Sequence, residues 1–277
     1  MSKQLILWNC RSLSGKINSI QYYVDHLRKR HKPHALFFTE AWLDYNVNNN
    51  DTEYRSYKLQ PFSHELFPSP SSEHDHIHGG IACYFYNHKL QQSPAIRQLA
   101  PDQYQSRHFK PQQHNSACDI VWFQMRLAHW ATLILIGITY LPPNSDEYTF
   151  QSDKEWWTNN VTFTINHNPD ASIILMGDFN SHHKQFGDKS TNARGSCLYN
   201  LTEDLDLQCI NKTHLRQQPT HKQGHVLDLV FTNPNTAALI HNMSIIDDPT
   251  TFDSDHLPIS ITLNTPTLEA SPSRLYI

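Results

Sequence analysis

Short apolar runs recur along the chain, and each is bounded by polar or turn residues. Runs of roughly four to eight apolar residues that are flanked in this way are typical of strands buried in a sheet. The predicted strands are Leu5–Trp8, Ala35–Thr39, Ile81–Tyr86, Asp119–Leu127, Trp130–Tyr140, Ser172–Met176, Val226–Thr232 and Leu257–Leu263. Because segments of helical periodicity lie between several of these runs, the order of elements predicts an α/β fold.

Three segments have the spacing of amphipathic helices. They are a helix over 16–30 that Pro33 terminates, a helix capped by Ser152 that carries Trp157, Val161 and Ile165, and a helix that carries Cys197, Leu198, Leu201 and Leu205. Residues 61–78 and 101–116 are predicted to be long loops, and residues 266–277 a C-terminal tail. Since no boundary divides the rest, residues 1–265 are expected to form one domain.

The composition narrows the class of protein. The formal net charge of −4 excludes a strongly basic nucleic-acid coat protein but leaves room for a local basic patch. Five scattered cysteines without a CxxC pair indicate a reducing compartment. The apolar run Leu5–Trp8 is shorter than the roughly 7–15 residues of a signal peptide, and no run reaches the roughly 20 residues of a membrane span. These features predict a nuclear or cytoplasmic protein that is not secreted and has no membrane partner.

Polar side chains lie at or near the ends of the predicted strands. They are Asn9, Glu40, Tyr140, Asp178, Asn180, Asp228, Asp255 and His256. In α/β proteins sites are built at this edge, although one such residue alone is usually a cap or part of a turn. Glu40 and Asp255 offer the hard oxygen ligands that Mg²⁺ uses, and an acid such as Asp228 could pair with a histidine. Carboxylates, a metal, a histidine and amide donors together suit phosphodiester hydrolysis.

A series of short motifs covers about residues 9 to 263. The motifs are WNCRSLSGK at 8–16, FFTEAWL at 37–43, GGIACYF at 79–85, TYLPP at 139–143, ILMGDFNSHH at 174–183, ARGSCLYNL at 193–201, QPTH at 218–221, VLDLVFTN at 226–233 and SDHLPI at 254–259. In this order they resemble the endonuclease/exonuclease/phosphatase superfamily, and more closely the apurinic-type endonuclease domain of non-LTR (LINE-type, Jockey-like) retrotransposons. The resemblance implies a DNase I-like, four-layer α/β sandwich, in which two mostly antiparallel mixed sheets pack face to face between helices.

The resemblance also implies a metal centre and a catalytic histidine. Glu40 matches the metal-binding glutamate, Asn9 lies beside it as a metal or phosphate contact, and Asp255 matches the second carboxylate at the metal. Asp228 matches the acid that pairs with the catalytic histidine, His256. Mg²⁺ is the implied cofactor, with Mn²⁺ as a substitute.

Other matched positions belong to the substrate side of the implied site. Asp178 matches the carboxylate that orients or deprotonates the attacking water, and Asn180 and Tyr140 match catalytic groups that contact the scissile phosphate. Arg11 is either a substrate-binding residue or a structural one. Taken singly, Asp178 and Asn180 could instead form an Asx-turn, and Tyr140 could simply pack.

The implied activity is a divalent-metal-dependent DNA endonuclease that leaves a 3′-hydroxyl nick, as in target-primed retrotransposition. A phosphatase or exonuclease of the same superfamily is one alternative, and a domesticated module that binds nucleic acid or protein without catalysis is another. DNA is the expected partner of a monomeric domain, with a reverse-transcriptase module if the chain is part of a longer polyprotein. Of the 19 histidines only His256 receives a catalytic role, and His182 and His183 are expected to pack or to lie near DNA.

Overall fold

The computed structural model describes residues 2–27, 32–43, 57–69, 79–86, 96–99, 119–126, 133–143 and 147–264. These residues form two six-stranded sheets. The first has the order β11-β12-β1-β2-β4-β3, with β1 Ser2–Asn9, β2 Ala35–Thr39, β3 Phe62–Phe67, β4 Ile81–Tyr86, β11 Ile240–Ile245 and β12 Ile259–Asn264. The second has the order β5-β6-β7-β8-β10-β9, with β5 Ile96–Gln98, β6 Asp119–Arg126, β7 Leu133–Tyr140, β8 Ser172–Asp178, β9 Gln208–Cys209 and β10 Asp228–Thr232.

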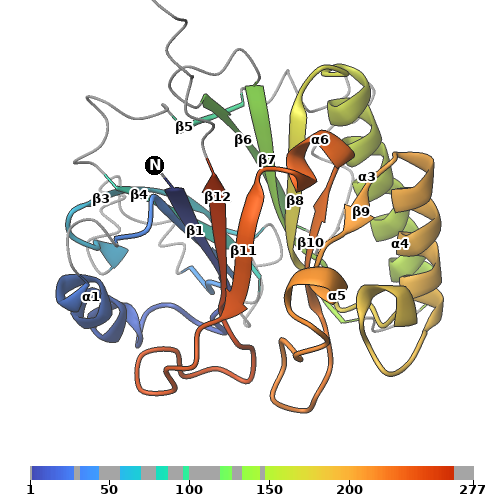
Figure 1. The fold of residues 1–277 in the computed structure, drawn as a ribbon. Coiled ribbons are helices and arrows are strands. Elements are labelled where there is room, and N and C mark those ends of the chain that lie inside the picture. Colours follow the sequence, from blue (N-terminus) through green and yellow to red (C-terminus); the bar gives the residue numbers. More distant parts are fainter. Residues whose placement is uncertain are drawn as a thin grey trace, which may run out of the picture.

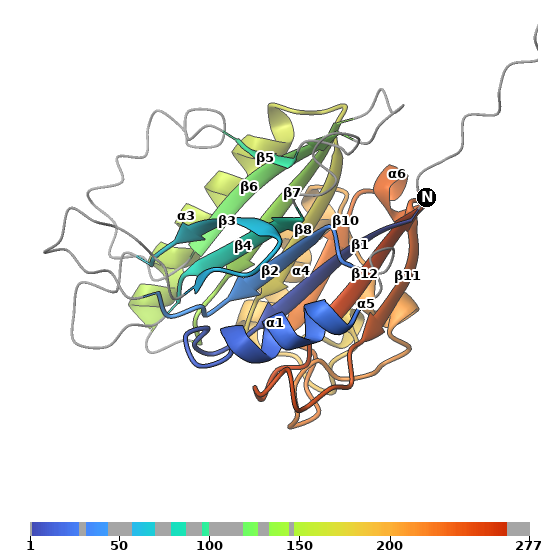
Figure 2. The same cartoon turned by 90° about the vertical axis from the view of Figure 1, so that its left-hand side faces the viewer.

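Helices cover the outer faces of both sheets (Figure 1). The helices are α1 Ile17–His26, α3 Glu147–Asn166, α4 Ala193–Asp204, the short α5 Asn211–His214 and α6 Pro234–Ala237, and the 3₁₀ turn η6 Lys184–Phe186. Figure 2 shows α1 lying across the outer face of the first sheet. Helices α3 and α4 cover the second sheet from the opposite side (Figure 1). The order helix, sheet, sheet, helix confirms the predicted four-layer sandwich.

Each sheet is mixed for the same reason. Strands β1 and β2 pair in parallel, as do β7 and β8, and all other pairs are antiparallel. A parallel pair needs a crossover, and the chain makes these two crossovers through α1 and α3. The inward side chains of both sheets form one apolar cluster, with Leu7, Phe37, Ile136 and Met176 among its members.

The sequence analysis misplaced several boundaries. The first helix ends at His26, before Pro33, and α3 begins at Glu147, so Ser152 lies inside that helix and does not cap it. The last strand starts at Ile259 and excludes Leu257. The predicted loop 61–78 contains β3, which pairs with β4 as an edge strand, because alternate polar residues are compatible with a strand that buries little of its surface.

Other expectations fall outside the described residues. These include the rest of the predicted loop beyond Ser69, the loop 101–116 and the tail 266–277. The proposed division into a domain and a tail therefore stays a prediction. Within the described ranges, no helix is long and apolar enough to cross a membrane.

Candidate active site

Four polar residues lie in register across the second sheet. Asp119 pairs with Tyr140, Tyr140 with Asp178, and Asp178 with Asp228. Because residues two apart in a strand share a face, each points to the same side as the inward apolar residues of its own strand. All four are buried, at one end of the core between the sheets. The strand register alone therefore places three carboxyl groups and a phenol side by side.

The first sheet brings Asn9 to the same end of the core. Asn9 follows the inward-facing Leu5 and Leu7 of β1 and is fully buried. Its amide Nδ2 donates to Asp178 Oδ2 at 2.7 Å and to Glu40 Oε1 at 3.1 Å. One amide thus links a carboxylate of the second sheet to a carboxylate that follows β2 of the first. The three side chains that the sequence placed in one site do meet.

Asp178 is at the centre of this arrangement. The backbone amide of Asn180 donates to Asp178 Oδ1 at 2.9 Å, and its side-chain amide donates to Oδ2 at 3.0 Å. His256 Nε2 lies 3.8 Å from the same Oδ2. Burial raises the pKa of Asp178 to about 7, against the opposing effect of the His256 cation. A carboxyl group whose pKa is close to neutral can exchange a proton at physiological pH.

His256 is paired with Asp228, as the sequence predicts. Its Nδ1 donates to Asp228 Oδ2 at 2.8 Å, and both side chains are almost completely buried. Burial lowers the pKa of His256, but the carboxylates of Asp228 and Asp178 outweigh this effect and raise it to about 10. The imidazole is therefore a cation at neutral pH, with Nε2 directed toward Asp178.

The free energy of unfolding should depend on pH through this pair. The pKa of His256 rises on folding from 6.5 to about 10, so its contribution is fully present below pH 6.5 and is lost as the pH rises toward 10. Urea denaturation should therefore show the wild type losing stability relative to His256→Gln between these two pH values. A stability difference that is the same at pH 6.5 and pH 10 would contradict the assignment.

Glu40 occupies a strained position beside Tyr140. Its backbone is left-handed, with a φ of 48°, as are those of Arg11 at 41° and Asn180 at 44°. Non-glycine residues adopt this conformation at a cost, and such strain concentrates at functional sites. The buried phenol of Tyr140 hydrogen-bonds to Glu40, and burial followed by the charge of Glu40 raises the Tyr140 pKa far above its usual range. Tyr140 therefore stays protonated.

Asp255 lies at the rim of the cluster and already has cationic partners. Arg11 Nη1 forms a short ion pair with Asp255 Oδ2, and His221 Nε2 lies 3.4 Å from the same oxygen. Burial alone would raise the pKa of Asp255. The positive charges of His256 and then of Arg11 lower it by more in total, so the net shift of the pKa is downward. The structure thus brings the two predicted residues Arg11 and Asp255 to each other.

The sequence analysis assigned no role to two residues of this cluster. Asp119 accepts a hydrogen bond from the backbone amide of Gly80 at 2.7 Å, and burial raises its pKa to about 7. His221 packs edge-on against His256, with ring centroids 4.8 Å apart. Asp119 has a sequence signal like that of Asp178, because both are polar residues that border an apolar run. His221 is the last residue of the QPTH motif.

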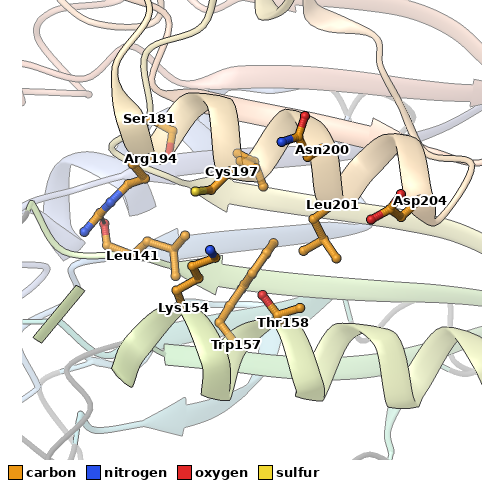
Figure 3. Close-up of a pocket in the computed structure, with 11 residues that line it drawn as sticks. Leu141, Lys154, Trp157, Thr158, Ser181, Arg194, Cys197, Asn200, Leu201 and Asp204 are labelled. Carbon is orange, nitrogen blue, oxygen red and sulfur yellow. Dashed lines mark hydrogen bonds between the residues drawn. The ribbon is translucent and has the colours of Figure 1, made fainter. Parts of the chain in front are cut away.

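A separate cavity of about 250 Å³ lies between α3 and α4 (Figure 3). Its walls are largely apolar, with Trp157 on α3 facing Leu201 on α4. None of the predicted site residues lines it. Leu141 joins the two regions, because its side chain lines the cavity while its carbonyl oxygen accepts from Asn180 Nδ2 at 2.9 Å. The predicted site residues thus lie at the polar end of the sandwich and not in this cavity.

Comparison with known proteins agrees with this architecture. Residues 134–260 match the family described as endonuclease-reverse transcriptase. Similar solved structures include the endonuclease domain of TRAS1, a telomere-specific non-LTR retrotransposon, which is 17% identical with a TM-score of 0.64 over 95% of this chain and 99% of that chain. A comparison with curated proteins finds no match.

Two other solved structures are comparably similar. The AP endonuclease LMAP from Leishmania major is 15% identical, with a TM-score of 0.69 over 96% of this chain and 88% of that chain. The 3′-5′ exonuclease NExo from Neisseria meningitidis is 14% identical, with a TM-score of 0.63 over 95% of this chain and 100% of that chain. At these identities the likeness establishes the fold. The chain therefore has the two-sheet fold of these endonuclease and exonuclease structures, and its residues 134–260 are similar to the endonuclease-reverse transcriptase family.

Proposed function

We propose that this protein is a divalent-metal-dependent DNA endonuclease that hydrolyses a phosphodiester bond and leaves a 3′-hydroxyl nick. The observation that carries the proposal is the position of Asp178, which lies between the amides of Asn9 and Asn180 and the His256 cation. This group combines a proton acceptor, amide donors and a cation within one buried cluster. Such a combination is suited to attack by water on a phosphodiester.

Each side chain of the cluster has a role in the proposed reaction. Asp178 orients the attacking water and accepts its proton. His256, held by Asp228, and the amide of Asn180 donate to the phosphate oxygens, where charge increases as water attacks. The protonated phenol of Tyr140 is a further donor toward the phosphate. Arg11 would contact the DNA backbone once it leaves Asp255.

The donor set at Glu40 fits a hard divalent cation. Glu40 is only partly buried, and it makes no ion pair with a cationic side chain among the described residues. Glu40 and Asn9 would hold the cation with bound waters, as Mg²⁺ prefers, with Mn²⁺ as a substitute. Asp255 would join them only after its ion pair with Arg11 opens. A bound cation would neutralise charge on the scissile phosphate.

The proposal predicts nicking of supercoiled plasmid DNA that requires Mg²⁺ and stops when EDTA is added. A DNA polymerase should extend the nick directly, because the 3′ end carries a hydroxyl group. Linear duplex ends and phosphate monoesters should react far more slowly. Preference for those substrates would favour the exonuclease or phosphatase alternative, and metal-independent DNA binding without turnover would favour the non-catalytic module.

The proposed biological setting follows from the matched family. A nick that ends in a 3′-hydroxyl can prime DNA synthesis, which is the step that target-primed retrotransposition requires. We propose DNA as the substrate and a reverse-transcriptase module as the partner if the chain is part of a longer polyprotein. The description of the matched family supports this pairing.

A further inference from the structure

A second cluster of titratable side chains lies outside the proposed catalytic group. His182 lies four residues after the end of β8, Asp188 follows η6, and His225 precedes β10 by three residues. His182 Nδ1 and His225 Nδ1 each lie 3.3 Å from the same oxygen, Asp188 Oδ2. The three ligand atoms lie within 4.8 Å of one another. Two loops far apart in sequence thus direct two imidazole nitrogens at one carboxylate oxygen.

Hydrogen bonding does not account fully for this geometry. Asp188 Oδ2 already accepts from the backbone amide of Val226 at 2.9 Å. His225 Nδ1 is a buried atom without a hydrogen-bond partner, although it lies 3.3 Å from Asp188 Oδ2. The distance from His182 Nδ1 also exceeds the usual 2.7–3.2 Å of an N–H···O bond. A metal ion bound between the two nitrogens and the oxygen would give His225 Nδ1 the partner that it lacks.

We propose that His182, Asp188 and His225 form a binding site for Zn²⁺ or a similar transition-metal ion, separate from the hard-cation site at Glu40. Zinc lies about 2.0–2.2 Å from nitrogen and oxygen ligands, so ligand atoms at neighbouring corners of a tetrahedron are about 3.3 Å apart. The distances from Asp188 Oδ2 to His182 Nδ1 and to His225 Nδ1 both have this value. Two imidazoles and one carboxylate favour zinc and related metals over Mg²⁺.

The surroundings are organised as a metal site requires. The Asp188 side chain is fully buried, and its other oxygen accepts from the backbone amide of Ser190 at 2.9 Å. The side chains of His182 and His225 are 27% and 33% exposed, so a water molecule can reach a fourth coordination position. The sequence analysis treated His182 and His183 alike, but His183 stacks on Tyr199 and faces a different environment.

A bound ion would connect the two loops that lead into the catalytic strands. One loop continues from Asn180 through His182, and the other continues from His225 into Asp228. Two hydrogen bonds already link these segments, from the Val226 amide to Asp188 Oδ2 and from the Phe179 amide to the Leu227 carbonyl oxygen. Zinc would add two coordinate bonds to imidazoles across this junction. The site is therefore structural in character and does not depend on the proposed nuclease activity.

Zinc binding can be measured by calorimetric titration of the EDTA-treated and dialysed full chain in excess Mg²⁺, which occupies hard oxygen sites. We expect one Zn²⁺ site whose affinity falls in H182A and in H225A by more than the roughly 10–100-fold that follows loss of an outer-shell partner. Co²⁺ should give the intense visible absorption of a tetrahedral complex in the wild type, and H225A should lose it. Thermal unfolding should shift upward with Zn²⁺ in the wild type but not in H182A or H225A.

Two control variants identify the site. H183A removes the adjacent histidine, which contacts Tyr199, and should bind Zn²⁺ like the wild type. H221A tests the neighbouring group of His221, Asp255 and His256, and it should also retain the site. Wild-type affinity in H225A, or loss of binding in H221A instead, would overturn the proposal. If H182A fails to fold, the more exposed position 225 still provides the test, through H225A and H225Q.

Discussion

D178N and H256A are each expected to lose about 10³-fold or more of the plasmid-nicking rate. Asp178→Asn keeps the shape of the side chain but removes the group that accepts the proton, and general acid–base groups contribute about 10²–10⁴-fold. His256→Ala removes the imidazolium cation whose Nε2 lies 3.8 Å from Asp178 Oδ2. The same substitution leaves Asp228 without its histidine partner. Nicking rates under single-turnover conditions with saturating Mg²⁺ measure both effects.

The matched control is His241→Ala, because His241 is exposed on β11 and lies outside the cluster. It should nick at the wild-type rate. The double variant D178N/H256A should be little slower than either single variant, since groups that act as a unit are not additive. Full activity in D178N or in H256A would refute the proposed roles, provided that circular dichroism shows the variant to be folded.

Gly177→Ala is expected to destabilise the fold by more than about 3 kcal/mol. An added Cβ would lie 1.8 Å from the carbonyl oxygen of Thr139 on the neighbouring strand, and the backbone φ of 154° is itself unfavourable for other residues. Gly177 belongs to β8, which has β7 on one side and β10 on the other, so neither strand can move away without breaking its own pairing. Overpacking of this kind usually costs about 1–3 kcal/mol, and here the obstacle is backbone.

Urea denaturation of G177A and G15A provides the comparison. Gly15 has nothing within 4 Å of an added Cβ, so G15A should keep the wild-type free energy of unfolding to within about 0.5 kcal/mol. Equal midpoints for the two variants would show that β8 adapts to a side chain at position 177. If G177A folds at low temperature, its nicking activity should also fall, because the shifted backbone carries Asp178.

The strands that the sequence located best are those whose residues are almost all buried. Strands β2, β4 and β8 are buried along their whole length, and their apolar runs stand out from their surroundings. Strands β3 and β11 lie at sheet edges and include polar residues such as His64 and Asn242, so no apolar run marks them. Edge strands bury less surface, and their positions depend on partners that a single sequence does not reveal.

The candidate site was predictable where each residue has its own motif. Asn9, Asp178 and His256 were found in this way, and the structure brings them together. Asp119 and the His225–Asp188 contact were not found, because both depend on which strand or loop lies alongside in three dimensions. The ion pair between Arg11 and Asp255 also spans almost the whole chain, and neither residue alone predicts it.

The row of buried carboxyl groups across β6, β8 and β10 lowers the stability of the folded state. Burial raises the pKa values of Asp119 and Asp178 to about 7, which means that the folded state disfavours their ionised forms at neutral pH. Neutral residues of similar size would avoid the cost of burying an ionisable carboxyl group. Variants selected only for thermal stability are therefore expected to accumulate amides at these positions, and an amide at position 178 would remove the proposed proton acceptor.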